Sequence, residues 1–319
     1  MVKANGYGLG AVPVARAALE AGAWGLAVAT SSEAAEVVEL VEDPERVLVM
    51  GGLNTGAAEL GCALQVSSAA QVQELAATGR RVPVHLKVDT GMGRFGCRPE
   101  EAPALAQAIV EAGLRLAGTW THFSSADSDD ALTRRQFDLF EDVLSSLGVD
   151  PGLRHACNSA AALRHPEFAL DAVRTGIAIY GCDWPELRPA LSLRALLTNV
   201  MTVPAGWTVG YGATWRAERE ARIGTVAIGY ADGVFRARGN AGWVLARGRR
   251  APLIGRVSMD AISVDLSDVD DAAVGDTVTL IGSDGGERIS AEQVAEWSGT
   301  ISYEVLTALG PRVERRYSE

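Results

Sequence analysis

Short apolar segments alternate with amphipathic stretches over roughly the first 185 residues of this 319-residue chain. Apolar residues recur at three- and four-residue steps in the intervening stretches, which is typical of helices that cover a sheet. Strand–helix alternation of this kind indicates a parallel sheet, and eight such units predict an α/β fold of the (β/α)8 barrel type. The predicted strands are residues 2–3, 24–29, 46–50, 63–66, 82–88, 114–119, 153–156, and 172–173 with 177–180.

After residue 188 the pattern changes to closely spaced strands, many of them separated by glycine turns. This pattern predicts a smaller, mainly β domain with two short helices near its end. We place the boundary near Pro189, which gives a barrel domain over 1–188 and a β domain over 189–319. The predicted strands of the second domain are residues 196–203, 222–228, 243–246, 252–259, 262–266 and 277–281, and its helices are 290–297 and 301–309.

The composition of the chain argues against some classes of binding partner and favours one cellular compartment. The net charge of -11 argues against nucleic acid or an anionic membrane as the main partner. No apolar run reaches the ~18 residues of a membrane span, and the opening residues do not resemble a secretory signal. The four cysteines lack metal-binding or redox spacing, so we expect a cytoplasmic protein without a metal site.

The chain begins with Met1-Val2-Lys3, followed by a segment with three glycines and a tyrosine. Lys3 therefore stands where a strand ends and a βα loop begins, and such loops bring backbone N–H groups close to an anion. A lysine beside a phosphate cradle suggests either a charge on a nucleotide phosphate or the amine that forms a Schiff base with pyridoxal phosphate. The nucleotide interpretation is the weaker one, because this lysine precedes the glycines. An N-terminal lysine exposed to solvent is the ordinary alternative.

Polar residues occupy most of the predicted strand ends in the first domain. In (β/α)8 barrels the chemistry lies at the carboxyl ends of the strands. One polar residue at a strand end is common, but seven on one rim favour an active site. These residues are Lys3, Lys87, Asp89, His122, Asn158, Ser159 and Arg174.

Nine sequence blocks, spread over both predicted domains, resemble alanine racemase, a fold-type III enzyme that depends on pyridoxal 5′-phosphate (PLP). The blocks are 2–5 with 7–8, 87–94, 121–123, 158–161, 174–177, 210–215, 229–233, 255–260, and 311–313 with 317. Each block alone is weak, but all of them occur in the order of the family. The resemblance implies an isomerase that interconverts L- and D-alanine, supplies D-alanine for peptidoglycan, and works as a homodimer with shared active sites.

The resemblance also implies two proton-transfer groups on opposite faces of the substrate Cα. Lys3 would hold PLP and serve the D-side proton, and Tyr211 of the other subunit would serve the L-side proton, oriented by His122. Arg174 would face the pyridine nitrogen and, because a guanidinium stays protonated, would leave that nitrogen largely unprotonated. Related decarboxylases present a carboxylate at this position, so Arg174 favours a racemase.

Further roles follow from the same resemblance. Arg94 and the backbone N–H of the partner's Met259 would bind the substrate carboxylate, and Asp260 would orient the Met259 loop. Lys87 matches a position that is carbamylated in many members, and Tyr230 would line the entry channel. The PLP phosphate would contact Tyr7, Ser159, the N–H groups of Gly176 and Ile177, and Tyr317.

The opening of the chain departs from the family, whose members carry a few tens of residues before the lysine. Only two residues precede it here, whereas a barrel strand needs about five. We therefore expect a truncated first strand that cannot pair fully with its neighbours, and lower stability than in a longer form. An inactive PLP-binding remnant, a broader or serine racemase, a decarboxylase and a non-catalytic PLP-binding protein are the alternatives. Arg174 disfavours the decarboxylase, and the β domain disfavours the non-catalytic protein.

Overall fold

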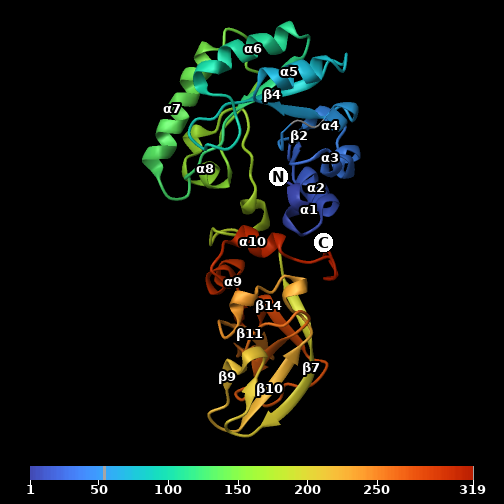
Figure 1. The fold of residues 1–319 in the computed structure, drawn as a ribbon, viewed down its shortest axis with the longest axis vertical. Coiled ribbons are helices and arrows are strands. Elements are labelled where there is room, and N and C mark those ends of the chain that lie inside the picture. Colours follow the sequence, from blue (N-terminus) through green and yellow to red (C-terminus); the bar gives the residue numbers. More distant parts are fainter. Residues whose placement is uncertain (53–54, 319) are drawn as a thin grey trace. The chain divides into compact units, whose positions relative to one another are not determined.

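A computed structural model describes residues 1–52 and 55–318, and the chain forms two compact units, Met1–Ile179 and Tyr180–Glu319 (Figure 1). The first unit ends earlier than the expected boundary near residue 188. It contains a parallel sheet in the order β1-β2-β3-β4-β5-β6, with helices α2 to α7 around its outside (Figure 1). The second unit is mainly β. The predicted fold class, an α/β barrel of the (β/α)8 type followed by a mainly β domain, is confirmed: the first unit is a curled parallel sheet with helices.

The strands of the first unit are short, and those from β1 to β4 are buried along their whole length. Complete burial is expected for parallel strands with one face inside the barrel and the other under helices. The strands are β1 (Leu26–Val28), β2 (Val47–Val49), β3 (Ala63–Val66), β4 (Pro83–Lys87), β5 (Arg115–Trp120) and β6 (Leu153–His155). The α-helices are α1 (Lys3–Tyr7), α2 (Ala11–Glu20), α3 (Ser31–Val37), α4 (Thr55–Glu59), α5 (Ala69–Ala76), α6 (Ala102–Glu111), α7 (Asp130–Ser146) and α8 (Ser159–Arg164).

Two short segments complete the ring where the first and eighth strands were predicted. Val2 donates its backbone N–H to Ala27 at the β1 side over 3.0 Å. The α-amino group of Met1 donates to the carbonyl of Thr175 over 3.1 Å, and a single parallel bridge joins Ala172 to β6. Isolated hydrogen bonds thus join these segments to their neighbours, in agreement with the expectation that the first strand pairs incompletely.

The prediction of a strand over residues 177–180 is wrong, since this segment is the 3-10 helix η5 (Ile177–Tyr180). The N–H groups of Gly176 and Ala178 donate to Oγ of Ser159 over 2.8 and 3.3 Å. The backbone therefore turns towards the start of α8, and these N–H groups are not available to a sheet ladder.

The second unit contains an antiparallel sheet in the order β11-β12-β13-β10-β7-β14-β15, and an additional β11–β14 pairing closes it on itself. Closure removes the exposed edges that an open sheet would present. The strands are β7 (Leu193–Val203), β8 (Thr208–Val209), β9 (Trp215–Arg216), β10 (Ala221–Val226), β11 (Trp243–Ala246), β12 (Arg249–Ile254), β13 (Ile262–Asp265), β14 (Thr277–Asp284) and β15 (Glu287–Ile289), and the helices are α9 (Ala291–Ser298) and α10 (Ser302–Thr307).

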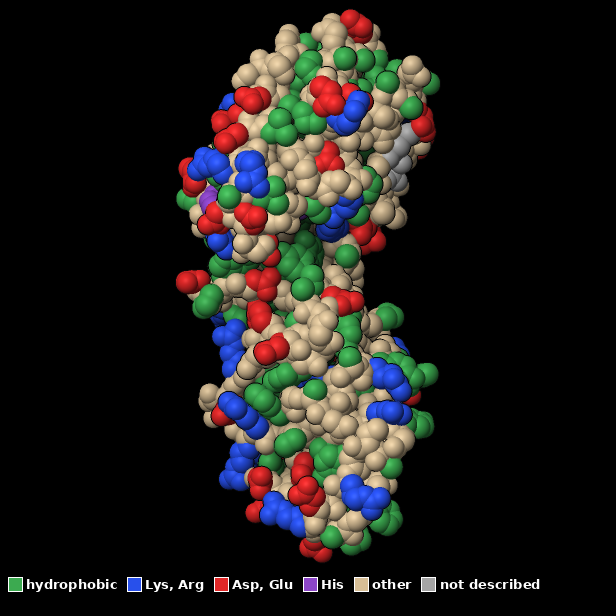
Figure 2. Space-filling view, turned by 60° about the vertical axis from the view of Figure 1, so that its left-hand side comes forward, with side chains coloured by type: hydrophobic (Ala, Val, Ile, Leu, Met, Phe, Trp, Pro, Cys, Tyr) green, Lys and Arg blue, Asp and Glu red, His purple; other side chains and the backbone are tan. Residues whose placement is uncertain are grey.

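Acidic and basic side chains are interspersed on the face of each unit seen in Figure 2. None of the helices within residues 1–52 and 55–318 is both long and apolar enough to cross a membrane.

Candidate active site

Lys3 opens a turn whose backbone has the left-handed conformation. Residues 4–7 all have positive φ, between 52° and 60°. This conformation costs roughly 1–2 kcal/mol for each non-glycine residue, so other contacts must hold it. The Glu33 carboxylate accepts the N–H of Ala4 and the N–H of Ala29, each over 2.7 Å. Because Ala29 directly follows β1, Glu33 ties the lysine turn to the carboxyl end of that strand.

The Lys3 amine has no partner in the part of the chain that the structure describes: no hydrogen bond or ion pair to Nζ is present there. Burial lowers its pKa, and the charge of Arg94 lowers it further, while Glu33 acts in the opposite direction. A lower pKa increases the neutral fraction of the amine, which is the form that attacks a carbonyl or accepts a proton.

A cradle of donors lies where α8 and η5 meet. The buried Ser159 hydroxyl accepts two backbone N–H groups and keeps its own hydrogen for a ligand. The N–H of Ile177 is buried and donates no hydrogen bond to any described residue. A Cβ at Gly176 would lie 2.5 Å from Oη of Tyr7, so this glycine lets the phenol approach. Burial raises the pKa of Tyr7 to about 12, which keeps its hydroxyl protonated. Together these groups suit an anion such as a phosphate.

Arg174 is held by five acceptors, three of them backbone carbonyls. Its Nη1 donates to Nδ1 and to the carbonyl of His155 over 2.9 and 3.0 Å. Its Nη2 lies 2.7 Å from the Thr121 carbonyl, 2.9 Å from the Ala156 carbonyl and 3.3 Å from Nδ1 of His122. The four terminal N–H groups are therefore occupied, and only the Nε–H lacks an acceptor among the described residues. Burial lowers the pKa of Arg174 to about 9, so it remains protonated at neutral pH.

The indole ring of Trp120, at the end of β5, lies against two basic side chains, Lys87 and Arg174. Nζ of Lys87 lies 3.6 Å from the ring centroid and Cζ of Arg174 lies 4.4 Å from it. Burial, followed by the charges of Arg174 and Arg94, lowers the pKa of Lys87 to about 6. Its amine is mostly neutral above that pH, as carbamylation requires, and carbamylation itself stays a prediction.

His122 and Arg94 complete the first-unit part of the site. Nδ1 of His122 faces a guanidinium N–H, so the neutral ring carries its hydrogen on Nε2. Burial and the surrounding cations, Arg174 first, lower the pKa of His122 to about 2. Arg94 is exposed on a loop that the Asp89 carboxylate organises by accepting the N–H groups of residues 91–93 over 2.7–2.9 Å.

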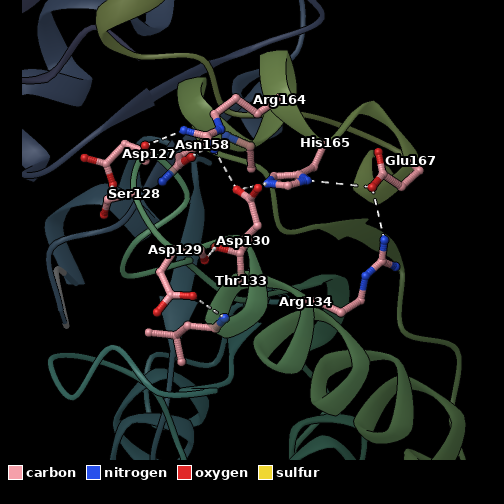
Figure 3. A network of polar contacts seen from close by, with 12 residues as sticks. Asp127, Ser128, Asp129, Asp130, Thr133, Arg134, Asn158, Arg164, His165 and Glu167 are labelled. Carbon is pink, nitrogen blue, oxygen red and sulfur yellow. Dashed lines mark hydrogen bonds and ion pairs between the residues drawn. The ribbon is translucent and has the colours of Figure 1, made fainter.

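A polar network joins α7 to the end of α8 (Figure 3). Arg164 donates to Asp130 over 2.7 Å, and Nε2 of His165 lies 3.2 Å from the same carboxylate oxygen. Glu167 pairs with Arg134 over 3.1 Å and with Nδ1 of His165 over 3.7 Å. The helix that carries the cradle serine is thus fixed to the segment that follows the His122 loop.

Tyr211 lies in the second unit, in the 3-10 turn η6 (Tyr211–Ala213), and is 71% exposed. The turn packs against Arg256, because a Cβ at Gly212 would lie 2.7 Å from Nη1 of that arginine. Asn240 also donates to Oγ1 of Thr214 over 3.1 Å. The turn is therefore supported from behind while the phenol faces outward, as a contribution to another subunit's site requires.

Three other predicted site residues of the second unit, Tyr230, Met259 and Tyr317, are also exposed. The N–H of Tyr230 donates to the carbonyl of Ser258 over 3.0 Å, which joins the Tyr230 turn to the Met259 loop. Asp260, the expected orienting residue of that loop, accepts from Arg312 over 2.8 Å.

The structure thus brings together in the first unit the predicted residues Lys3, Tyr7, Lys87, Arg94, His122, Ser159, Arg174, Gly176 and Ile177. Sequence reasoning did not select Glu33, Trp120 or His155, which hold the lysine turn and the guanidinium. Trp120 directly follows a predicted strand, and that position was the one available signal. Within residues 1–52 and 55–318, no three His, Cys, Asp or Glu side chains group as metal ligands.

Known proteins match the chain over nearly all its length. The family model described as alanine racemase, N-terminal domain, matches residues 1–183, and that described as alanine racemase, C-terminal domain, matches residues 190–317. The alanine racemases of Desulfovibrio desulfuricans and Sorangium cellulosum are 42% and 41% identical to the chain. Both alignments cover 100% of the chain, with 90% and 91% of the respective relative.

Solved alanine racemase structures share the fold. The enzyme from Pseudomonas aeruginosa has a TM-score of 0.89 at 42% identity, covering 100% of this chain and 91% of that one. The enzyme from E. faecalis has a TM-score of 0.91 at 37% identity, covering 98% and 88%. The Bartonella henselae structure, described with covalently bound pyridoxal phosphate, has a TM-score of 0.89 at 31% identity, covering 99% and 91%.

Proposed function

The chain belongs to the alanine racemase family and is an isomerase, and from its site we infer that it interconverts L- and D-alanine by two-base proton transfer with PLP. The observation that carries this inference is the half-buried amine of Lys3, which has no partner among the described residues and lies in the unit that also holds the anion cradle and Arg174. We further propose a homodimer with shared sites, located in the cytoplasm, whose D-alanine serves peptidoglycan synthesis.

The residues of the first unit fit the cofactor. The hydroxyls of Tyr7 and Ser159 and the N–H of Ile177 would hold its phosphate, and the exposed Tyr317 would add a second phenol. Lys3 would hold its carbonyl carbon, and the Nε–H of Arg174 would donate to its ring nitrogen. When bound, PLP supplies a conjugated system that takes up the charge left when the Cα proton is removed.

Two groups would then exchange that proton from opposite sides. The lowered pKa of Lys3 would increase the neutral fraction of the amine on the D-side. Tyr211 of the partner subunit would work on the L-side, where the Nε2–H of His122 would orient its oxygen. Arg94 and the N–H of the partner subunit's Met259 would fix the substrate carboxylate, and Tyr230 would line the entrance.

Arg174 supports a racemase over a decarboxylase. A protonated guanidinium would donate a hydrogen bond to the ring nitrogen without transferring its proton, so the bound cofactor would supply a weaker electron sink than one with a protonated ring nitrogen. A less delocalised charge would favour return of the proton to Cα over other reactions.

Chiral product analysis tests this function directly. Purified protein with added PLP should convert L-alanine until equal amounts of both enantiomers are present, since mirror-image forms have equal free energies. Faster conversion of L-serine would favour the serine racemase alternative. Retained PLP without any D-amino acid would favour the inactive remnant.

The Gly176→Ala variant tests the phosphate cradle. The new methyl group would lie 2.5 Å from Oη of Tyr7 and would displace that phenol. Loss of one hydrogen bond to a charged group costs about 1.5–3 kcal/mol, so PLP should bind about 10- to 150-fold more weakly. Fluorescence titration of the PLP-free protein measures this affinity.

Gly56→Ala is the matched control, because the nearest atom of the described residues to a Cβ at Gly56 would be Oγ of Ser31, at 3.6 Å. Its PLP affinity should equal that of the original protein. Equal affinities for all three proteins would show that Tyr7 does not hold the phosphate.

A further inference from the structure

Two buried histidines lie behind Arg174. His85, in β4, is 4% exposed, and His155, the last residue of β6, is 2% exposed. Nδ1 of His85 lies 2.8 Å from Nε2 of His155, and Nδ1 of His155 lies 2.9 Å from Nη1 of Arg174. The three side chains therefore form one continuous row of hydrogen bonds.

The chemistry of the groups fixes the direction of each bond in this row. A guanidinium only donates, so Nδ1 of His155 must accept and its hydrogen must be on Nε2. That Nε2–H donates to Nδ1 of His85, which places the hydrogen of His85 on Nε2 as well. Burial, followed by the charges of Arg115 and Arg174, lowers the pKa of His85 to about 3, and burial likewise brings the pKa of His155 well below its usual range. Both rings are neutral at neutral pH.

Neighbouring residues leave space for the His85 ring and fix the plane of the His155 ring. A Cβ at Gly118, the β5 residue paired with His85, would lie 2.5 Å from Nδ1 of that histidine. Glycine therefore leaves the space that the ring occupies. The His155 ring stacks on Trp120 with 5.6 Å between centroids and an interplanar angle of 6°. Stacking fixes the plane of the His155 ring, and its hydrogen bond to His85 on β4 fixes its rotation within that plane.

We propose that His85 is a positioning residue, which accepts the Nε2–H of His155, fixes the rotation of that ring and through it the orientation of Arg174. Without this acceptor, the His155 ring could rotate within its stacking plane and move Nδ1 away from Nη1 of Arg174, from which it now lies 2.9 Å. Nη1 would lose one of its two acceptors, and the guanidinium could rotate. The Nε–H of Arg174 would then no longer point in a fixed direction. The proposed contact to the cofactor ring depends on that direction. This step rests on the proposed function, whereas the hydrogen bonds from His85 to Arg174 are properties of the chain alone.

The test compares His85→Leu, which removes the acceptor, with His85→Gln, whose amide oxygen replaces it. The chain has four histidines, so nitrogen-15 spectra of the PLP-free protein can resolve each ring. We expect the Nε2–H tautomer for His85 and His155 in the original protein. The His155 Nε2–H should be hydrogen-bonded, with its proton resonance shifted downfield, in the original protein and in the Gln variant but not in the Leu variant. In the PLP-loaded enzyme, the Leu variant should lower kcat about tenfold while KM changes by less than about twofold.

Gln65→Leu is the matched control. Gln65 is the β3 residue paired with His85, it is 1% exposed, and neither of its side-chain amide atoms has a hydrogen-bond partner within the described residues. Its replacement should change neither the hydrogen bond of the His155 Nε2–H nor kcat.

Three results would overturn the proposal: a protonated or Nδ1–H His155 in the original protein, a hydrogen-bonded His155 Nε2–H that persists in the Leu variant, or loss of that hydrogen bond with kcat unaffected. If the Leu variant does not fold, the spectra of the original protein and the Gln variant still decide. If no D-alanine forms at all, the proposed function fails, and the tautomer measurement stands independently of it.

Discussion

Replacing Lys3 by alanine is expected to reduce racemisation by about four orders of magnitude or more, because one side chain supplies both the attachment of PLP and one of the two proton-transfer groups. The chain contains only two lysines, Lys3 and Lys87, and the second is 3% exposed. Borohydride reduction of the PLP-loaded protein, followed by peptide mapping, should therefore label Lys3. Chiral chromatography measures the loss of activity.

The Lys3→Ala variant should keep its fold, since Nζ makes no hydrogen bond or ion pair within the described residues and the surrounding turn is held by backbone contacts to Glu33. Removal of a partly desolvated cation should leave the free energy of unfolding within about 1 kcal/mol of the original value. Two results would contradict the proposed role of Lys3: borohydride labelling of Lys87 in its place, or D-alanine formation by the Lys3→Ala variant at the original rate.

Much of this site could be predicted because strand ends meet at one rim of a parallel barrel. Lys87, His122, Ser159 and Arg174 each follow or end an apolar run, and the structure places them in the same unit. The alternation of strands and helices in the sequence therefore sufficed to predict which residues belong to the site.

The prediction of a strand over residues 177–180 is wrong for a physical reason that lies outside the local sequence. Residues 177–180 are apolar and resemble a strand, but the hydroxyl of Ser159, 17 residues before Gly176, captures two backbone N–H groups of that region. Local periodicity contains no information about such a distant acceptor. The same applies to Glu33, which holds a turn 29 residues before it.

The hydrogen-bonded pair His85 and His155 illustrates a second limit of prediction from sequence. His85 and His155 lie 70 residues apart and each sits within or at the end of an apolar strand, where a lone histidine is ordinarily a structural residue. Only the pairing of β4 with β5 and of β5 with β6 brings their rings together. Sequence spacing alone could not distinguish this pair from two independent core residues.

Replacing Tyr211 by phenylalanine should lower racemisation about 10²- to 10⁴-fold, the usual contribution of a positioned acid–base group. The phenol is 71% exposed, so its loss should leave the fold of its own chain intact. Because the proposed site combines Lys3 of one subunit with Tyr211 of the other, the two single variants should complement each other.

In a mixed dimer of Lys3→Ala and Tyr211→Phe subunits, one site lacks both groups and the other retains both. If subunits associate at random in equal amounts, half of the dimers are mixed and one of their two sites works, so about one quarter of the original activity should return. Co-expression with two different affinity tags, followed by sequential purification, isolates the mixed dimer, which should show about half of the original activity. Activity that stays at the level of the single variants would mean that both groups act within one chain, and the shared-site proposal would then be wrong.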